Sequence, residues 1–196
     1  MMRWRANALE FWWCMSYVDF ALDMYGDGKL AGHPKDAGRF VAEARFDAAV
    51  KQLSLHTLTD ANNIAAIGYC FGDVLVEASC RRWCSEVTPL KGVVSFHSRL
   101  DTAQPAKRGE IKARVLVFNG EDDSFVKSTS IKVFRQEMTD AGADVSFVSL
   151  AGAKHSFTNP GATAIGKKFG LPLEYNKKAG QDSWQQMKLL FETLFK

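Results

Sequence analysis

Four short apolar runs constrain the fold of this chain more than any other sequence feature. They occupy residues 64–69, 92–97, 114–119 and 144–150. Runs that are apolar on both faces are typical of strands in a sheet that helices cover on both sides. Because helix-like segments alternate with these runs, the strands must be joined by crossovers, which favours a mostly parallel sheet. The sequence therefore predicts a three-layer α/β fold.

The remaining elements follow from the periodicity of apolar residues. A further strand is expected over 17–23. Helices are expected over 39–55, 74–84 and 128–141, the last ending at Gly142, and an amphipathic helix is expected over 181–195. No repeat or linker divides the chain, so we expect a single domain over residues 1–196, with an atypical apolar segment at 1–16.

Composition and charge exclude several classes of protein. Hydrophobic residues make up 46% of the 196 residues and charged residues 24%, which is typical of a globular chain rather than a disordered one. The net charge is only +3 and the basic residues are scattered, so no nucleic-acid partner is expected. The apolar runs are too short to span a membrane, so no membrane association is expected either.

The cysteines and histidines give no metal-binding pattern. The four cysteines form no CxxC pair, and the four histidines form no HxxxH pair. The first residues predict no signal peptide, and free thiols favour a reducing compartment, so we expect a cytoplasmic protein without a metal or organic cofactor. A redox role for Cys70 is a minor alternative, since no resolving cysteine is evident near it in sequence.

Candidate catalytic residues directly follow the expected strands. Gly68, Cys70 and Gly72 form the pattern G-x-C-x-G between an apolar run and an expected helix. A nucleophile on so tight a strand-to-helix turn needs neighbours without a Cβ. The helix N-terminus favours a thiolate, and the backbone N–H of Phe71 is placed to receive an oxyanion. The alternative is a buried cysteine in a glycine-bracketed turn.

Two further strand ends carry the partners that such a nucleophile requires. The residues after 114–119 include Asp122 and Asp123, and the loop after 144–150 contains His155. Taken singly, the two aspartates would be interpreted as part of a solvated turn, and the histidine as an exposed loop residue. In the order nucleophile, acid, histidine, they match the chain order of α/β-hydrolases. The histidine would then transfer protons, and the acid would hold its tautomer.

These motifs resemble the dienelactone hydrolase family, which uses a cysteine nucleophile. The resemblance covers about residues 17–196 and rests on four segments. They are Asp23–Gly26, Gly68–Gly72, Gly120–Val126 and Gly152–Phe157. It implies an α/β-hydrolase fold that cleaves carboxylic-ester or lactone bonds, with Cys70 as nucleophile and His155 as base. The family acid lies three residues before a valine, so Asp123 matches it and Asp122 is the second choice.

Departures from the family pattern bear on activity. Only 69 residues precede Cys70, so the first strands are expected to be missing, together with the loop that usually supplies a second oxyanion donor. The alternative function is therefore a catalytically impaired relative that acts as a binding or scaffold protein. We expect the apolar segment 1–16 to cover the exposed sheet face, within the chain or across a homodimer interface.

The substrate is expected to be a small neutral ester, lactone or thioester. Family members that act on dienelactone bind its carboxylate with two arginines, at positions where this chain has Asp27 and Asn159. Neither position is basic here, so an anionic dienelactone is a poor match. Lys154 and Arg99 could supply positive charge, although both are expected to be solvated surface residues.

Overall fold

The computed structural model describes residues 17–19, 21, 43–70, 90–102 and 105–196. The chain divides into two units, Met1–Ala61 and Asn62–Lys196. In the first unit, the described residues form one helix, α3 (Glu43–Ser54), within the segment expected to be helical. Residues 17–19 and 21 have no regular secondary structure, so the strand expected over 17–23 is not formed in the described part of that range.

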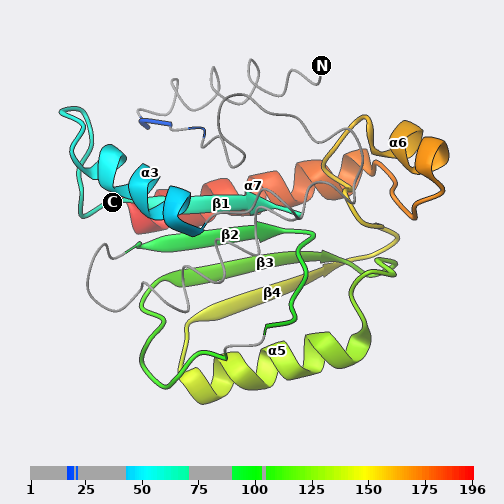
Figure 1. The fold of residues 1–196 in the computed structure, drawn as a ribbon, viewed down its shortest axis with the longest axis horizontal. Helices are drawn as coiled ribbons and strands as arrows, with labels where there is room; N and C mark the ends of the chain where they lie inside the picture. The colour runs from blue at the N-terminus through cyan, green and yellow to red at the C-terminus, as the bar shows by residue number, and fades with distance from the viewer. Residues whose placement is uncertain (1–16, 20, 22–42, 71–89, 103–104) are drawn as a thin grey trace. The chain divides into compact units, whose positions relative to one another are not determined.

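The second unit contains a sheet of four parallel strands in the order β1-β2-β3-β4 (Figure 1). The strands are β1 (Ala65–Tyr69), β2 (Gly92–Phe96), β3 (Arg114–Gly120) and β4 (Val145–Leu150). All five residues of β2 and six of the seven residues of β3 are buried. This burial on both faces confirms the prediction of a mostly parallel sheet covered by helices.

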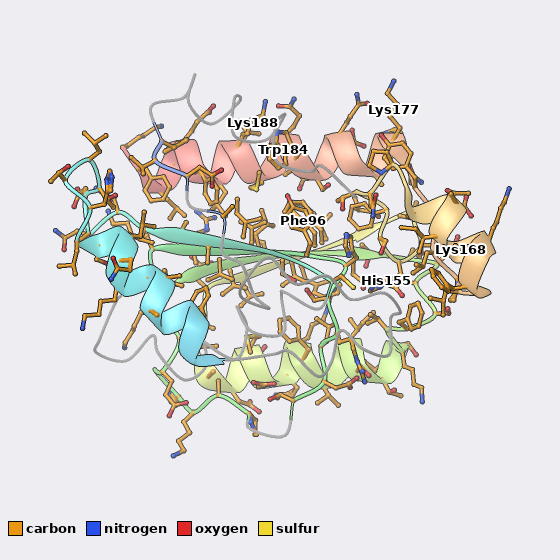
Figure 2. All side chains as sticks on the ribbon, turned by 45° about the horizontal axis from the view of Figure 1, so that its top comes forward. Phe96, His155, Lys168, Lys177, Trp184 and Lys188 are labelled. Carbon is orange, nitrogen blue, oxygen red and sulfur yellow. The ribbon has the colours of Figure 1, made fainter. Side chains whose placement is uncertain are left out.

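The described residues of the second unit form three helices, α5 (Ser128–Ala141), α6 (Ala162–Phe169) and α7 (Lys177–Leu194). Two of them, α5 and α7, form the outer layers (Figure 2). Figure 2 shows α7, which carries Lys177, Trp184 and Lys188, on one face of the sheet and α5 on the other. The three-layer α/β prediction is therefore confirmed for this unit.

Helices α5 and α7 each present a buried, mostly apolar face to the rest of the unit. On α7 the buried residues recur at helical spacing: Ala179, Ser183, Met187, Leu190 and Phe191. On the opposite face, Phe134 of α5 lies with its ring centroid 6.1 Å from that of Phe147 in β4. Helix α5 ends as predicted at Gly142, whose left-handed backbone (φ 67°) directs its N–H to the carbonyl of Thr139.

The register aligns the carboxyl ends of the strands at one edge of the sheet. Tyr69 pairs with Phe96, Phe96 with Phe118, and Gly120 with Leu150. In open parallel sheets, functional groups gather beyond this edge. The described residues before Ala65 form no strand, but most of residues 1–42 lie outside the description, so the expected loss of the first strands stays a prediction. None of the described helices is long and apolar enough to cross a membrane.

Candidate active site

Cys70 is the first residue beyond β1, and the backbone turns sharply there. Its N–H donates to the carbonyl of Phe96 over 3.0 Å, which extends the ladder between β1 and β2 by one residue. Its φ is 54°, in the left-handed region that side chains other than glycine rarely adopt. Such local strain holds a nucleophile out at the edge of a sheet. Phe71, the expected oxyanion donor, lies outside the described residues.

His155 lies in the loop after β4, and Figure 2 shows it beyond the carboxyl ends of the strands. Its carbonyl accepts a hydrogen bond from the N–H of Glu174, which ties the loop to the segment before α7. The loop also packs against Gly120 at the end of β3, where a Cβ would lie 2.3 Å from the carbonyl oxygen of Ala153. A glycine is therefore required at position 120 for the loop to approach.

The structure brings Cys70, His155 and Asp123 into one chain of contacts. The Sγ atom of Cys70 lies 3.0 Å from Nε2 of His155, and Nδ1 of His155 lies 2.8 Å from Oδ2 of Asp123. The other carboxylate oxygen, Oδ1, accepts a hydrogen bond from the N–H of Phe125 over 2.9 Å. Asp123 is 4% exposed, whereas the second-choice acid Asp122 is exposed to solvent.

The surroundings of His155 favour its charged form. Burial is the strongest influence and opposes the charge, but the hydrogen bonds to Asp123 and Cys70 outweigh it and raise the pKa of His155 to about 9. The ring of Phe125 lies edge-on to the imidazole, with centroids 4.9 Å apart. The geometry supplies a thiol, a basic nitrogen within hydrogen-bond reach, and a carboxylate that orients it, as nucleophilic catalysis requires.

Sequence reasoning missed a second histidine at this site. His97 is the first residue beyond β2, with a φ of 47°, and its ring centroid lies 5.3 Å from that of His155. Its Nε2 atom is 2.8 Å from Oγ1 of Thr158. Burial, followed by the nearby charge of His155, lowers the pKa of His97 to about 3, so its ring is neutral. The sequence signal for His97 was its place as the last residue of the apolar run 92–97.

The other residues weighed from the sequence lie away from this contact chain or outside the description. Lys154 forms an ion pair with Glu174 (Nζ to Oε2, 2.7 Å), and Arg99 is exposed. Asn159 accepts a hydrogen bond from the N–H of Gly161 just before α6. Asp27 lies outside the described residues.

One group among the described residues has the donor atoms to hold a metal ion. Ligand atoms of Cys70, His97 and His155 all lie within 4.8 Å of one another.

Known proteins resemble this chain over most of its length. A metagenomic dienelactone hydrolase-like promiscuous phosphotriesterase is 30% identical, with a TM-score of 0.75, and covers 89% of this chain and 73% of its own. A solved structure named m3DLH is also 30% identical, with a TM-score of 0.76 and the same coverage. An uncharacterized protein of Caenorhabditis elegans is 27% identical over 143 residues, which are 72% of this chain and 86% of the relative.

A more distant structure supports the fold alone. A dienelactone hydrolase homologue from Klebsiella pneumoniae is 19% identical, with a TM-score of 0.64, and covers 86% of this chain and 70% of its own. Residues 17–195 match the sequence model of the dienelactone hydrolase family. This match agrees with the α/β-hydrolase architecture and with the resemblance in the sequence motifs. The chain therefore belongs to the dienelactone hydrolase family.

Proposed function

We propose that this chain hydrolyses carboxylic-ester or lactone bonds with Cys70 as nucleophile, His155 as proton carrier and Asp123 as the carboxylate that orients His155. The observation that carries the proposal is the unbroken contact chain from Sγ of Cys70 to Nε2 of His155, and from Nδ1 of His155 to Oδ2 of Asp123. The contact distances, 3.0 and 2.8 Å, are within hydrogen-bond reach.

The proposed reaction has two halves. The proton shared by Cys70 and His155 rests on Nε2 of His155, as the raised pKa of His155 favours, and the Cys70 thiolate attacks the carbonyl carbon to form a tetrahedral oxyanion. His155 then protonates the leaving oxygen as the bond to carbon breaks, which leaves a thioester on Cys70. A water molecule gives a proton to His155 and attacks the thioester. The acid is released, and Cys70 again shares its proton with Nε2 of His155.

Oxyanion stabilisation is assigned in this proposal to the backbone N–H of Phe71. A donor directly after the nucleophile is the usual arrangement on such a turn. Loss of one oxyanion donor typically costs about 10²–10³ in rate. A second donor would therefore raise the rate by a similar factor.

The charges near the site favour an uncharged substrate. Lys154 is already paired with Glu174, and the side-chain oxygen of Asn159 is engaged by the N–H of Gly161. The aromatic rings of Phe125 and His97 each contact His155 as neutral neighbours. An assay should therefore use neutral esters and lactones. Because one relative is described as a promiscuous phosphotriesterase, a neutral phosphotriester belongs in the same panel.

Hydrolysis of p-nitrophenyl butyrate by the purified chain tests the proposal. We expect a burst of p-nitrophenolate, together with a butyryl adduct on the peptide that contains Cys70 after acid quench. Cys70→Ala should abolish both, whereas Asp122→Asn, which alters an exposed carboxylate, should retain both. Turnover that survives Cys70→Ala would refute the assignment. A folded wild type with neither turnover nor adduct would support the alternative, an impaired relative that acts as a binding protein.

A further inference from the structure

One ring nitrogen of His97 has no hydrogen-bond partner, neither in the chain of contacts from Cys70 to Asp123 nor elsewhere among the described residues. The residue is 3% exposed, its Nε2 atom contacts Thr158, and its Nδ1 atom is buried without a hydrogen-bond partner. Buried polar atoms are nearly always paired, so such an atom calls for an explanation. Neutral imidazole nitrogens are common ligands of transition metals, for which no hydrogen-bond partner is needed.

The neighbours of His97 complete a set of donor atoms. One donor atom from each of Cys70, His97 and His155 lies within 4.8 Å of the other two. In a tetrahedral zinc site, Zn–S is about 2.3 Å and Zn–N about 2.0–2.1 Å, which places one sulfur and two nitrogen ligands roughly 3.3–3.6 Å apart. Side-chain rotations that move the ligand atoms by about 1 Å would therefore bring them to the separations of a tetrahedral zinc site.

The residues behind the histidines match the outer contacts of a metal site. Histidines that bind a metal usually donate their second ring N–H to a carboxylate, a backbone carbonyl or water, and a threonine hydroxyl oxygen can accept in the same way. His155 has this arrangement through Oδ2 of Asp123, and His97 has it through Oγ1 of Thr158. A ligand would therefore meet the unpaired Nδ1 of His97 and the Nε2 of His155 that now faces Sγ of Cys70.

We propose that Cys70, His97 and His155 bind one zinc ion, with the fourth position open to water, and that this binding reversibly inhibits hydrolysis. The metal replaces the thiol proton, which passes to solvent, and occupies Sγ of Cys70 together with a nitrogen of His155. The inhibitory part rests on the proposed function, because it requires that the same two atoms perform hydrolysis. The binding part rests only on the cluster.

Cobalt(II) titration tests binding independently of activity. A thiolate ligand gives Co(II) a charge-transfer band in the near ultraviolet, and tetrahedral coordination gives visible bands. We expect one equivalent of Co(II) to produce both in the wild type, and zinc to displace it. Cys70→Ser should abolish the charge-transfer band. His97→Asn should weaken zinc binding by more than about 100-fold, and Thr158→Val by about 10–100-fold, since loss of an outer contact typically has that effect.

His56→Asn is the matched control, because it removes an exposed histidine from the other unit and should leave zinc affinity unchanged. Circular dichroism of each variant checks that it is folded. A charge-transfer band that persists in Cys70→Ser, or zinc affinity that is equal in His97→Asn and wild type, would overturn the site. Ester hydrolysis is then measured with zinc and after chelation by EDTA.

Inhibition by zinc with recovery in EDTA supports the regulatory part, and activation by zinc refutes it. A chain that binds zinc at this cluster but hydrolyses no ester would refute the proposed function and the inhibitory part, while the metal site would stand.

Discussion

Replacement of Asp123 by asparagine tests how the contact chain controls the protonation of His155. The N–H of Phe125 donates to Oδ1 of Asp123, so in Asp123→Asn the amide oxygen should keep that position. The amide NH₂ group then faces Nδ1 of His155, where Oδ2 now lies 2.8 Å away. Nδ1 becomes a hydrogen-bond acceptor, and the imidazole proton moves to Nε2. The ring can then no longer take the thiol proton from Cys70.

The size of the effect follows from the pKa of His155. In the wild type, that pKa rises from 6.5 to about 9 despite burial. At 1.36 kcal/mol per pKa unit, the shift equals about 3 kcal/mol in favour of the charged ring. Without the carboxylate, only Cys70 opposes the effect of burial, so we expect the pKa of His155 in Asp123→Asn to fall well below 9. Ester turnover should fall by roughly 10⁴-fold, as for a triad with the wrong tautomer.

NMR titration of the imidazole resonances measures this pKa directly, with His155→Gln used for assignment. The control is Asp122→Asn, which should leave the titration near 9 because that carboxylate is exposed. A midpoint that stays near 9 in Asp123→Asn would refute the reasoning. So would equal losses of turnover in the two variants.

The same shift predicts how stability depends on pH. A pKa that is raised in the folded state contributes stability that is fully present below about 6.5 and is lost as the pH rises through about 9. Urea unfolding of the wild type should therefore show about 3 kcal/mol less stability from this group above pH 9 than at pH 6. Asp123→Asn should lack this decrease.

Four other expectations test the rest of the molecule. Limiting iodoacetamide should label Cys70 before the other three thiols, and peptide mapping that finds another thiol labelled first counts against a reactive nucleophile. Gly120→Ala should reduce turnover sharply at unchanged oligomeric state, because the new Cβ would meet the carbonyl oxygen of Ala153 at 2.3 Å and displace the histidine loop; kinetics equal to wild type would contradict this. Phe134→Ala should lower the free energy of unfolding by about 3–5 kcal/mol in urea titration, and a loss under 1 kcal/mol would show that its packing is dispensable. If the apolar segment 1–16 covers a sheet face across a homodimer, light scattering should give twice the chain mass, whereas a monomer with a protease-sensitive segment 1–16 would refute both covering arrangements.

The central sheet could be predicted because its signal is local. Residues 92–97 and 114–119 are mostly apolar on both faces, a pattern that is typical of a strand covered on both sides. Helix α6 was missed because it has eight residues, too few for a clear period. The strand expected over 17–23 is wrong for its described residues, where apolar composition alone was not enough to form one.

Residues of the candidate site could be predicted from the sequence where they directly follow an expected strand. Cys70 and His155 were found in this way, and the family motif selected Asp123 over Asp122. His97 was missed because it was counted as the last residue of an apolar run, whereas the structure places it one residue beyond β2. Its proximity to His155 depends on the register of three neighbouring strands, which sequence patterns do not give.

The left-handed backbone conformation at Cys70 and His97 implies a trade-off between activity and thermal stability. Residues with a Cβ cost roughly 1–2 kcal/mol each in this conformation, and glycine would relieve much of that cost. Cys70→Gly would relieve this backbone strain, but it would also remove the proposed nucleophile and its contact with His155. Thermostable variants of this chain should accordingly be sought with simultaneous screening for turnover.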